Sequence, residues 1–298
     1  MDNLYLGVDI GGTHITAALV NVASGVVLEH TVVRHTVDPE DAAGEIINAW
    51  AAVIKQVTAF SKESKQLLIG IAMPGPFDYE KGISLIKEQK KFRSLFGLNV
   101  KKMLAAKLGM EAAQIHFLND ACSFLCGELL GGAVKGEKMA IGITLGTGLG
   151  SALYFDESCA DAALWDVRFK DGIAEDYLST RWFTSEFFKR YDIEVKGVKE
   201  MLPFIAKDKS KAAIFEEFGN NLALFLLQVV KKTGCSTIVL GGNISRTAPY
   251  FLESLQQQFK LADVVPDIRL SEIGESAVLI GAAGEAHNKL SKKWKTIA

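Results

Sequence analysis

The sequence predicts a two-domain α/β protein, and three observations support this class. The length of 298 residues exceeds that of one typical domain and fits two. Apolar β-type runs alternate with segments of helical periodicity along the chain. The stretch "GVDIG" (7–11) also matches "GITLG" (142–146) in character, and a similar small apolar triplet follows each. This weak internal repeat predicts two similar sheets, each presenting a glycine turn.

The chain opens with three expected strands that form a meander. Residues 4–10 ("LYLGVDI") form a short apolar run, and residues 14–22 carry β-branched and small apolar side chains without helical spacing. A third strand is expected at 25–37, after a Ser-Gly turn signal. An amphipathic helix then begins near Pro39. The next elements are expected in this order: a strand at 66–78, a helix at 100–109, a strand at 114–118 and a helix at 121–132.

The pattern restarts at residue 139 with a strand, a glycine loop and a strand ("MAIGITLGTGLGSALYF"). Residues 174–233 are mostly helical by pattern, and 236–245 form a strand that ends in two glycines. A helix-like segment to residue 259 and a terminal helix at 277–294 complete the chain.

No low-complexity linker separates the two halves, so the domain boundary is expected at a tight crossover near 117–120. The first half of the chain then ends at 118, and the second begins at 119.

Composition argues against several function classes. The net charge is −2 and no basic block occurs, so nucleic acid and anionic membranes are not expected partners. No apolar run reaches the roughly 18–20 residues that cross a bilayer, and the N-terminus lacks the basic region of a signal peptide. We therefore expect a cytoplasmic protein. The four cysteines form no disulfide framework or Cys-x-x-Cys pair, and the five histidines are scattered, so no zinc site is expected.

Two glycine turns, Gly11-Gly12-Thr13 and 146–150, are each followed by β-type sequence. A dinucleotide fingerprint requires a helix directly behind its glycines, and a Walker loop requires Gly-Lys-Ser/Thr; neither condition is met. The turns are therefore predicted to be β-hairpin connections whose backbone N–H groups point at phosphate oxygens. Two such turns would hold the β- and γ-phosphates of ATP.

Five motifs in order resemble those of the ROK family of the actin-like sugar-kinase superfamily. They are "DIGGTHI" (9–15), "NDA" (119–121), "TLGTGLG" (144–150), "LGGNIS" (240–245) and "SAVLIGAAGEA" (276–286). The match covers nearly the whole chain. It implies a two-domain actin-like (ribonuclease H-like) fold with the active site in the interdomain cleft. In this fold the C-terminal helix 276–298 joins 1–118 in the first domain, and 119–275 form the second domain. The match also implies ATP-dependent phosphorylation of a sugar hydroxyl, as in glucokinase-like hexose or amino-sugar kinases, and a homodimer.

On the nucleotide side, the resemblance implies that Asp9 holds Mg²⁺ through water, which suits a hard oxygen ligand. The alternative is a turn-initiating aspartate. His14 stands where the family often has lysine and receives no role. The implied ATP-binding residues are Gly11, Gly12, Thr13, Thr144, Gly146, Thr147, Gly148, Gly150, Gly241, Gly242 and Asn243.

On the acceptor side, the resemblance implies that Asp120 is the general base that takes the proton of the sugar hydroxyl, while Asn119 positions the sugar. Both are also good helix N-caps, which contribute about 1 kcal/mol without any catalytic role. Gly75, in the Pro-Gly-Pro loop, is expected to contact the sugar through its backbone or to serve only as a rigid turn. Glu175 matches the family's Glu-x-Tyr-x-Ser helix start and is carried over as a sugar-hydroxyl contact.

The acceptor side also departs from the family. The Glu-x-Gly-His motif and the cysteine-rich zinc loop are absent, and the shorter segment 156–172 stands in their place. This segment either rebuilds the acceptor pocket or is a surface loop. Trp165 is a candidate for stacking on a sugar face, and Arg168 or Lys170 for meeting an anionic group.

A second departure places Lys90, Lys91 and Arg93 where the family usually has an Asn-Leu stretch. Because the acceptor motif is lost, a catalytically silent ROK protein that senses a sugar or nucleotide is the alternative to a kinase. A transcriptional regulator is not favoured, because family regulators carry a helix-turn-helix ahead of a first phosphate motif that begins here within the first ten residues.

Overall fold

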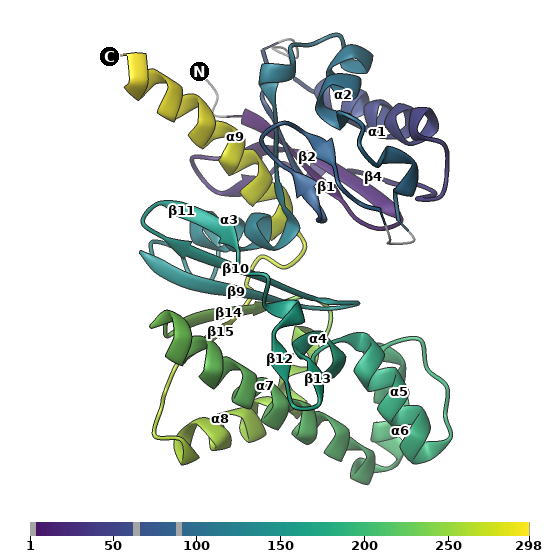
Figure 1. The fold of residues 1–298 in the computed structure, drawn as a ribbon, viewed down its shortest axis with the longest axis vertical. Helices are drawn as coiled ribbons and strands as arrows, with labels where there is room; N and C mark the ends of the chain where they lie inside the picture. Colours follow the sequence, from purple (N-terminus) through teal and green to yellow (C-terminus); the bar gives the residue numbers. More distant parts are fainter. Residues whose placement is uncertain (1–3, 62–65, 88–90, 298) are drawn as a thin grey trace. The chain divides into compact units, whose positions relative to one another are not determined.

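The computed structural model describes residues 4–61, 66–87 and 91–297, with the backbone alone for 290–297. Lys90 therefore lies outside the described residues. The chain divides into two compact units, Met1–Gly136 with Glu275–Ala298 and Glu137–Gly274. Figure 1 shows the elements of both units along the chain.

A six-stranded sheet forms the centre of the first unit. Its order is β3-β2-β1-β5-β8, and β4 also pairs with β2. The β1–β2 pair is antiparallel, whereas β5 runs parallel to β1 and β8 parallel to β5. The strands are β1 (Leu4–Ile10), β2 (His14–Asn21), β3 (Val26–Val27), β4 (Val33–Thr36), β5 (Ile69–Met73) and β8 (Ile115–Asn119), and a separate hairpin joins β6 (Phe77–Asp78) to β7 (Ile83–Ser84).

Helices cover both faces of this sheet. Leu6, Val8 and other apolar side chains of one face share a core with α1 (Ala43–Thr58) and α2 (Val100–Leu108). Alternation along the strand places Gly7 on the opposite face, where it is paired with Gly70 of β5. A Cβ built on Gly70 would lie 1.7 Å from the Ala282 carbonyl oxygen, so this face receives the backbone of α9 (Ser276–Ile297) at close range (Figure 1).

Helix α3 (Asp120–Gly131) packs against α9 in the same way. A Cβ on Gly127 would lie 1.9 Å from the Ala277 oxygen, and one on Gly281 would lie 1.8 Å from the Ser123 oxygen. Only glycines allow the two helix backbones to approach so closely. For this reason α3 is counted with the first unit, whereas the boundary expected from the sequence falls before it, at 118.

The second unit repeats the strand plan of the first. Its sheet has the order β11-β10-β9-β14-β15, with an antiparallel β9–β10 pair and parallel β9–β14 and β14–β15 pairs. The strands β9, β10, β14 and β15 thus correspond to β1, β2, β5 and β8. Their bounds are β9 (Met139–Leu145), β10 (Leu149–Phe155), β11 (Ser158–Asp161), β14 (Thr237–Gly241) and β15 (Asp267–Leu270), with a small hairpin of β12 (Arg168–Phe169) and β13 (Gly172–Ile173).

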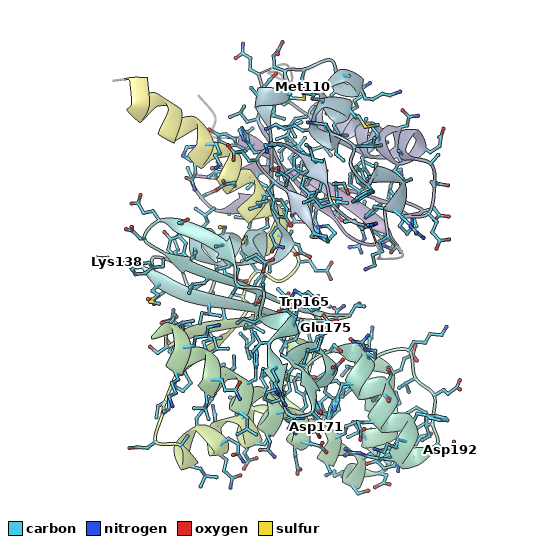
Figure 2. The ribbon with its side chains drawn as sticks, viewed as in Figure 1. Met110, Lys138, Trp165, Asp171, Glu175 and Asp192 are labelled. Atoms are coloured by element: carbon cyan, nitrogen blue, oxygen red, sulfur yellow. The ribbon has the colours of Figure 1, made fainter. Side chains whose placement is uncertain are left out.

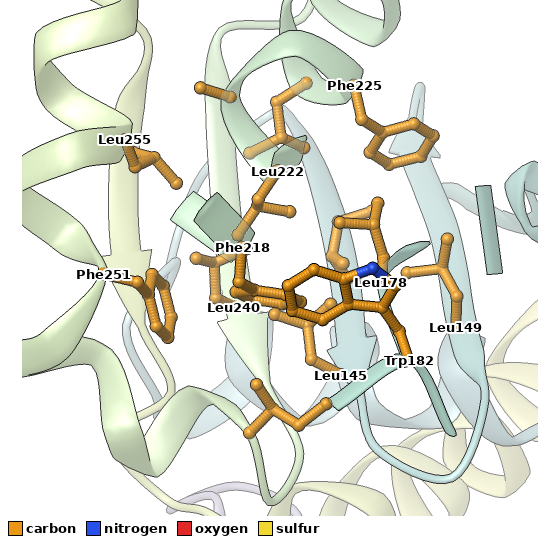
Figure 3. Packing of buried hydrophobic residues seen from close by; sticks show 14 of the residues in the cluster. Leu145, Leu149, Leu178, Trp182, Phe218, Leu222, Phe225, Leu240, Phe251 and Leu255 are labelled. Atoms are coloured by element: carbon orange, nitrogen blue, oxygen red, sulfur yellow. The ribbon is translucent and has the colours of Figure 1, made fainter. Parts of the chain in front are cut away.

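The core of the second unit lies between this sheet and its helices. Phe218 and Leu222 of α7 pack with strand residues such as Leu240, as Figure 3 shows. By length and composition, Lys209–Thr233 is the one candidate membrane span among the described residues, but 56% of its apolar window is buried inside the protein. The helices are α4 (Ala174–Tyr177), α5 (Thr180–Tyr191), α6 (Val198–Lys207), α7 (Ala213–Thr233) and α8 (Leu252–Leu261).

Two details of the first unit differ from the sequence-based expectation. The strand expected at 25–37 is split into β3 and β4 by the 3-10 helix Glu29–Thr31. The buried Thr31 hydroxyl stabilises this break, because it accepts from the Leu19 N–H at 2.9 Å and donates to the Leu28 carbonyl at 2.7 Å. Helix α1 begins at Ala43, so Pro39 precedes it.

Candidate active site

The first glycine turn connects two antiparallel strands. Ile10 pairs with Ile15, and the Gly11 N–H donates to the His14 carbonyl at 2.9 Å. Thr13 is exposed, and its hydroxyl lies 2.8 Å from His14 Nδ1. The chain therefore enters a strand behind Gly12, and the prediction of a hairpin turn is confirmed.

Asp9 is the partly buried acidic residue near the end of β1. It pairs with Thr16 on β2, which in turn pairs with Arg34 on β4, so the three side chains follow one cross-strand row. The pKa of the Asp9 carboxyl is raised from 3.8 to about 6, first by burial and then by the negative charge of Asp120. The Arg34 guanidinium acts in the opposite direction. Asp9 and Asp120 therefore form an electrostatically coupled pair of carboxylates.

Asn119 and Asp120 mark the junction between β8 and α3. The Asn119 side-chain oxygen accepts from the Ala121 N–H at 2.8 Å and from the Cys122 N–H at 3.2 Å. Asp120 Oδ1 also accepts from the Ala121 N–H at 2.8 Å. The capping role is thus present. Capping uses Oδ1 of each side chain and is compatible with a further role for the Asp120 carboxylate.

Tyr79 joins this junction to the Pro-Gly-Pro loop. Its hydroxyl accepts from Asn119 Nδ2 at 3.3 Å and donates to the Met73 carbonyl at 3.1 Å. A Cβ built on Gly75 would lie 3.3 Å from the same hydroxyl oxygen. Three predicted residues, Gly75, Asn119 and Asp120, are thereby brought together. Tyr79 was not predicted, because an aromatic residue behind a turn carries no spacing signal.

The second glycine turn is held by the start of α5. Leu145 pairs with Leu149, and the Gly146 N–H donates to the Gly148 carbonyl at 3.1 Å. The backbone N–H and the hydroxyl of Thr180 both donate to the Gly146 carbonyl at 2.8 Å. This turn is also a strand-to-strand connection, as predicted.

The segment Gly241–Asn243 lies directly against that turn. Gly241 pairs with Thr144 in parallel register, and the Ile244 N–H donates to the Leu145 carbonyl at 3.0 Å. Gly242 has φ +83°, and a Cβ there would lie 2.4 Å from the Leu145 oxygen, so both its conformation and its surroundings favour glycine. The second unit therefore places two of the three predicted nucleotide motifs in contact, with Asn243 exposed.

Glu175, on α4, also lies at the second glycine turn. Its Oε2 accepts from the Leu149 N–H at 3.0 Å, and its other oxygen lies 3.6 Å from Arg181. The 3-10 helix that carries Trp165 contacts α4, and Trp165 is 45% exposed (Figure 2).

Lys170 is a less suitable ligand for an external anion than the sequence suggested. Its ammonium group donates to Asn221 Oδ1 and lies 5.1 Å from the centroid of the Tyr177 ring. Its ammonium group is therefore already engaged by partners within the second unit, although Lys170, like Arg168, is an exposed residue.

The described residues include no group of three or more histidine, cysteine or acidic side chains that could hold a metal ion, and none of the four cysteines forms a disulfide. Mg²⁺ usually binds through one or two carboxylates, retained waters and the phosphates of a substrate. Asp9 fits this type of site, because its carboxylate is partly buried beside the second negative charge of Asp120, which a cation would offset.

Comparison with known proteins decides the family. A model described as "ROK family" matches residues 5–161, which is more than half of the chain. The chain belongs to the ROK family. An N-acetyl-D-glucosamine kinase from Photobacterium profundum is 26% identical and aligns over 94% of this chain and 98% of its own length.

Two solved structures have the same fold. A ROK hexokinase from Thermus thermophilus superposes with a TM-score of 0.77 at 20% identity and covers 97% of this chain and 99% of its own. A ROK family glucokinase from Streptomyces griseus, in complex with glucose and AMPPNP, superposes with a TM-score of 0.76 at 21% identity. The match covers 96% of this chain and 99% of the glucokinase chain. The actin-like α/β fold is confirmed, and this ROK protein is an ATP-dependent sugar kinase.

Tyr79→Phe tests the expectation that Asn119 positions the sugar. The variant loses a neutral hydrogen bond that orients Asn119, so we expect a roughly threefold to tenfold higher KM for the sugar, with kcat and the KM for ATP changed much less. Steady-state kinetics with each substrate varied gives both constants. Tyr191→Phe, at the end of α5, is the matched control. Equal sugar KM values for Tyr79→Phe and the native protein would contradict the positioning role.

Proposed function

We propose that this ROK kinase transfers the terminal phosphoryl group of ATP to a hydroxyl of a hexose or an amino sugar, with Asp120 as the general base. The observation that carries the proposal is the position of Asp120. It stands at the first turn of α3, next to an Asn119 that is linked through Tyr79 to the Gly75 loop. The full-length relationship to an N-acetyl-D-glucosamine kinase supports the same substrate class.

The proposed reaction needs one proton acceptor. Asp120 takes the proton of the attacking sugar hydroxyl, whose oxygen bonds to the γ-phosphorus while the bond between that phosphorus and the leaving ADP oxygen breaks. Asn119 orients the sugar, because its own amide orientation is fixed by the helix cap on one side and Tyr79 on the other. Phosphoryl transfer depends chiefly on such positioning and on charge stabilisation.

We assign the nucleotide phosphates to the turns at 11–13 and 146–150, and the adenosine to 241–243. Backbone N–H groups at glycine turns are suitable donors to phosphate oxygens. Asp9 is assigned to Mg²⁺ through water, and the bound ion would neutralise charge on the phosphates. The proposal also places the enzyme in the cytosol as a homodimer.

On the second unit, we assign contacts with the acceptor sugar to Glu175 and Trp165. A carboxylate that accepts from a backbone N–H retains further lone pairs for sugar hydroxyls. An exposed indole on the neighbouring 3-10 helix offers an apolar face to a sugar ring.

An ATP-coupled screen tests the proposal. ADP release is measured separately with glucose, mannose, N-acetylglucosamine, N-acetylmannosamine and glucuronate. A reaction without any sugar is the blank. We expect sugar-dependent ADP release with at least one hexose or amino sugar. Binding of nucleotide and sugar without turnover on any acceptor would contradict the kinase and would support the sugar- or nucleotide-sensing alternative.

A further inference from the structure

Lys91 lies over the first glycine turn, although it is far from that turn in the sequence. A Cβ built on Gly12 would lie 2.7 Å from both Cε and Nζ of Lys91. The lysine stem therefore crosses the glycine where any other residue would place its side chain. Both residues belong to the first unit, together with Asp9 and Asp120.

The segment that carries Lys91 is anchored in the core. Phe92 is fully buried and packs edge-on against Trp50 of α1, with ring centroids 5.2 Å apart. The Phe92 N–H donates to the Pro39 carbonyl at 2.9 Å, and the Val37 N–H donates to the Thr13 carbonyl at 2.8 Å. Residues 37–39 are thus hydrogen-bonded both to the glycine turn, at Thr13, and to Phe92, which follows Lys91. These two bonds hold the backbone next to Lys91 and the glycine turn to the same short segment.

The ammonium group of Lys91 is exposed and has no ion-pair or hydrogen-bond partner among the described residues. The turn itself carries one basic side chain, His14, whose Nδ1 lies 2.8 Å from the Thr13 hydroxyl oxygen. A cation that lies against a glycine turn, and that has no counter-ion in the described part of the chain, is suited to bind an external anion. At this turn the proposed function places a nucleotide phosphate.

We propose that Lys91 donates a charge-assisted hydrogen bond to the terminal phosphate of ATP at the turn of Gly12. The inference rests on the proposed function, which supplies the nucleotide. Lys91 acts only as a hydrogen-bond donor, so no covalent bond is formed or broken at it. Lys91 would add a positive charge to the phosphate site, and it comes from the basic stretch that stands where the family usually has Asn-Leu.

Isothermal titration calorimetry with AMPPNP and Mg²⁺ tests this role without turnover. Lys91→Met should raise the dissociation constant by about tenfold or more, as expected for loss of a hydrogen bond to a charged group. Lys91→Arg should retain most of the affinity. AMP lacks the terminal phosphate, so its affinity should be the same in all variants. Lys87→Met is the matched control, because Lys87 is an exposed lysine of the same segment.

The outcomes separate this inference from the proposed function. AMPPNP affinity of Lys91→Met within twofold of the native value would overturn the role of Lys91 while leaving the kinase intact. An equal loss of AMPPNP and AMP affinity in Lys91→Met would also overturn it, because AMP has no terminal phosphate for Lys91 to bind. A native protein that binds no AMPPNP would overturn both proposals.

Discussion

Asp120→Asn should lower kcat for sugar phosphorylation by about a hundredfold to ten thousandfold, the usual contribution of a general base. Asparagine has the same shape and retains an oxygen that accepts from the Ala121 N–H, so the start of α3 should remain intact. It cannot take a proton from the sugar hydroxyl. The affinity for AMPPNP should therefore change little while turnover is lost, and coupled kinetics together with calorimetry measures both.

Glu45→Gln is the matched control for Asp120→Asn, because Glu45 is an exposed acid in the first turn of another helix of the same unit, α1. Glu45→Gln removes the same charge from the first turn of a helix, at a residue that is not part of the proposed active site. Full turnover is expected for the control. An Asp120→Asn enzyme with more than a tenth of native kcat would show that Asp120 serves only as a helix cap.

Asp9→Asn should have opposite effects on stability and on activity. The folded-state pKa of Asp9, about 6, lies above the ordinary value of 3.8. The folded protein therefore binds this proton more tightly than the unfolded chain, and the resulting stability is lost as the pH rises from about 4 through 6. At pH 8 the ionised carboxylate costs roughly 3 kcal/mol of folding free energy. Asparagine removes that cost.

Denaturant unfolding at pH 8 and at pH 4 checks the sign of this effect. The Asp9→Asn variant should be more stable than the native protein at pH 8, with little difference at pH 4. Its turnover should fall, because the variant lacks the carboxylate proposed to hold Mg²⁺. A variant that is less stable at pH 8, or one that keeps native activity at low Mg²⁺ concentration, would contradict the account of Asp9.

The hairpin geometry of the two glycine turns could be predicted because its sequence signal is local. Gly12 and Gly148 are each followed by β-type sequence, and this fact alone separates a hairpin turn from a helix start. The N-cap residues Asn119 and Asp120 were likewise readable from their types and their position behind a strand. In each case the neighbouring residues determine the structure, so no knowledge of distant contacts was required.

Features that depend on distant contacts could not be predicted. Gly127 and Gly281 are ordinary helix residues by pattern, and only the packing of α3 on α9 explains them. Lys91 was visible as a departure from the family, but no spacing rule connects it with Gly12. The short edge strand β15 also went unrecognised, because it follows Pro266 directly and contains only one strongly apolar pair, Ile268 and Leu270.

Phosphorus NMR of the native protein with Mg²⁺, ATP and the best sugar of the screen measures the destination of the γ-phosphoryl group. The account predicts a sugar-phosphate resonance that grows in step with ADP. Inorganic phosphate as the sole phosphorus product besides ADP, or ATP that remains intact in the presence of every sugar, would contradict it.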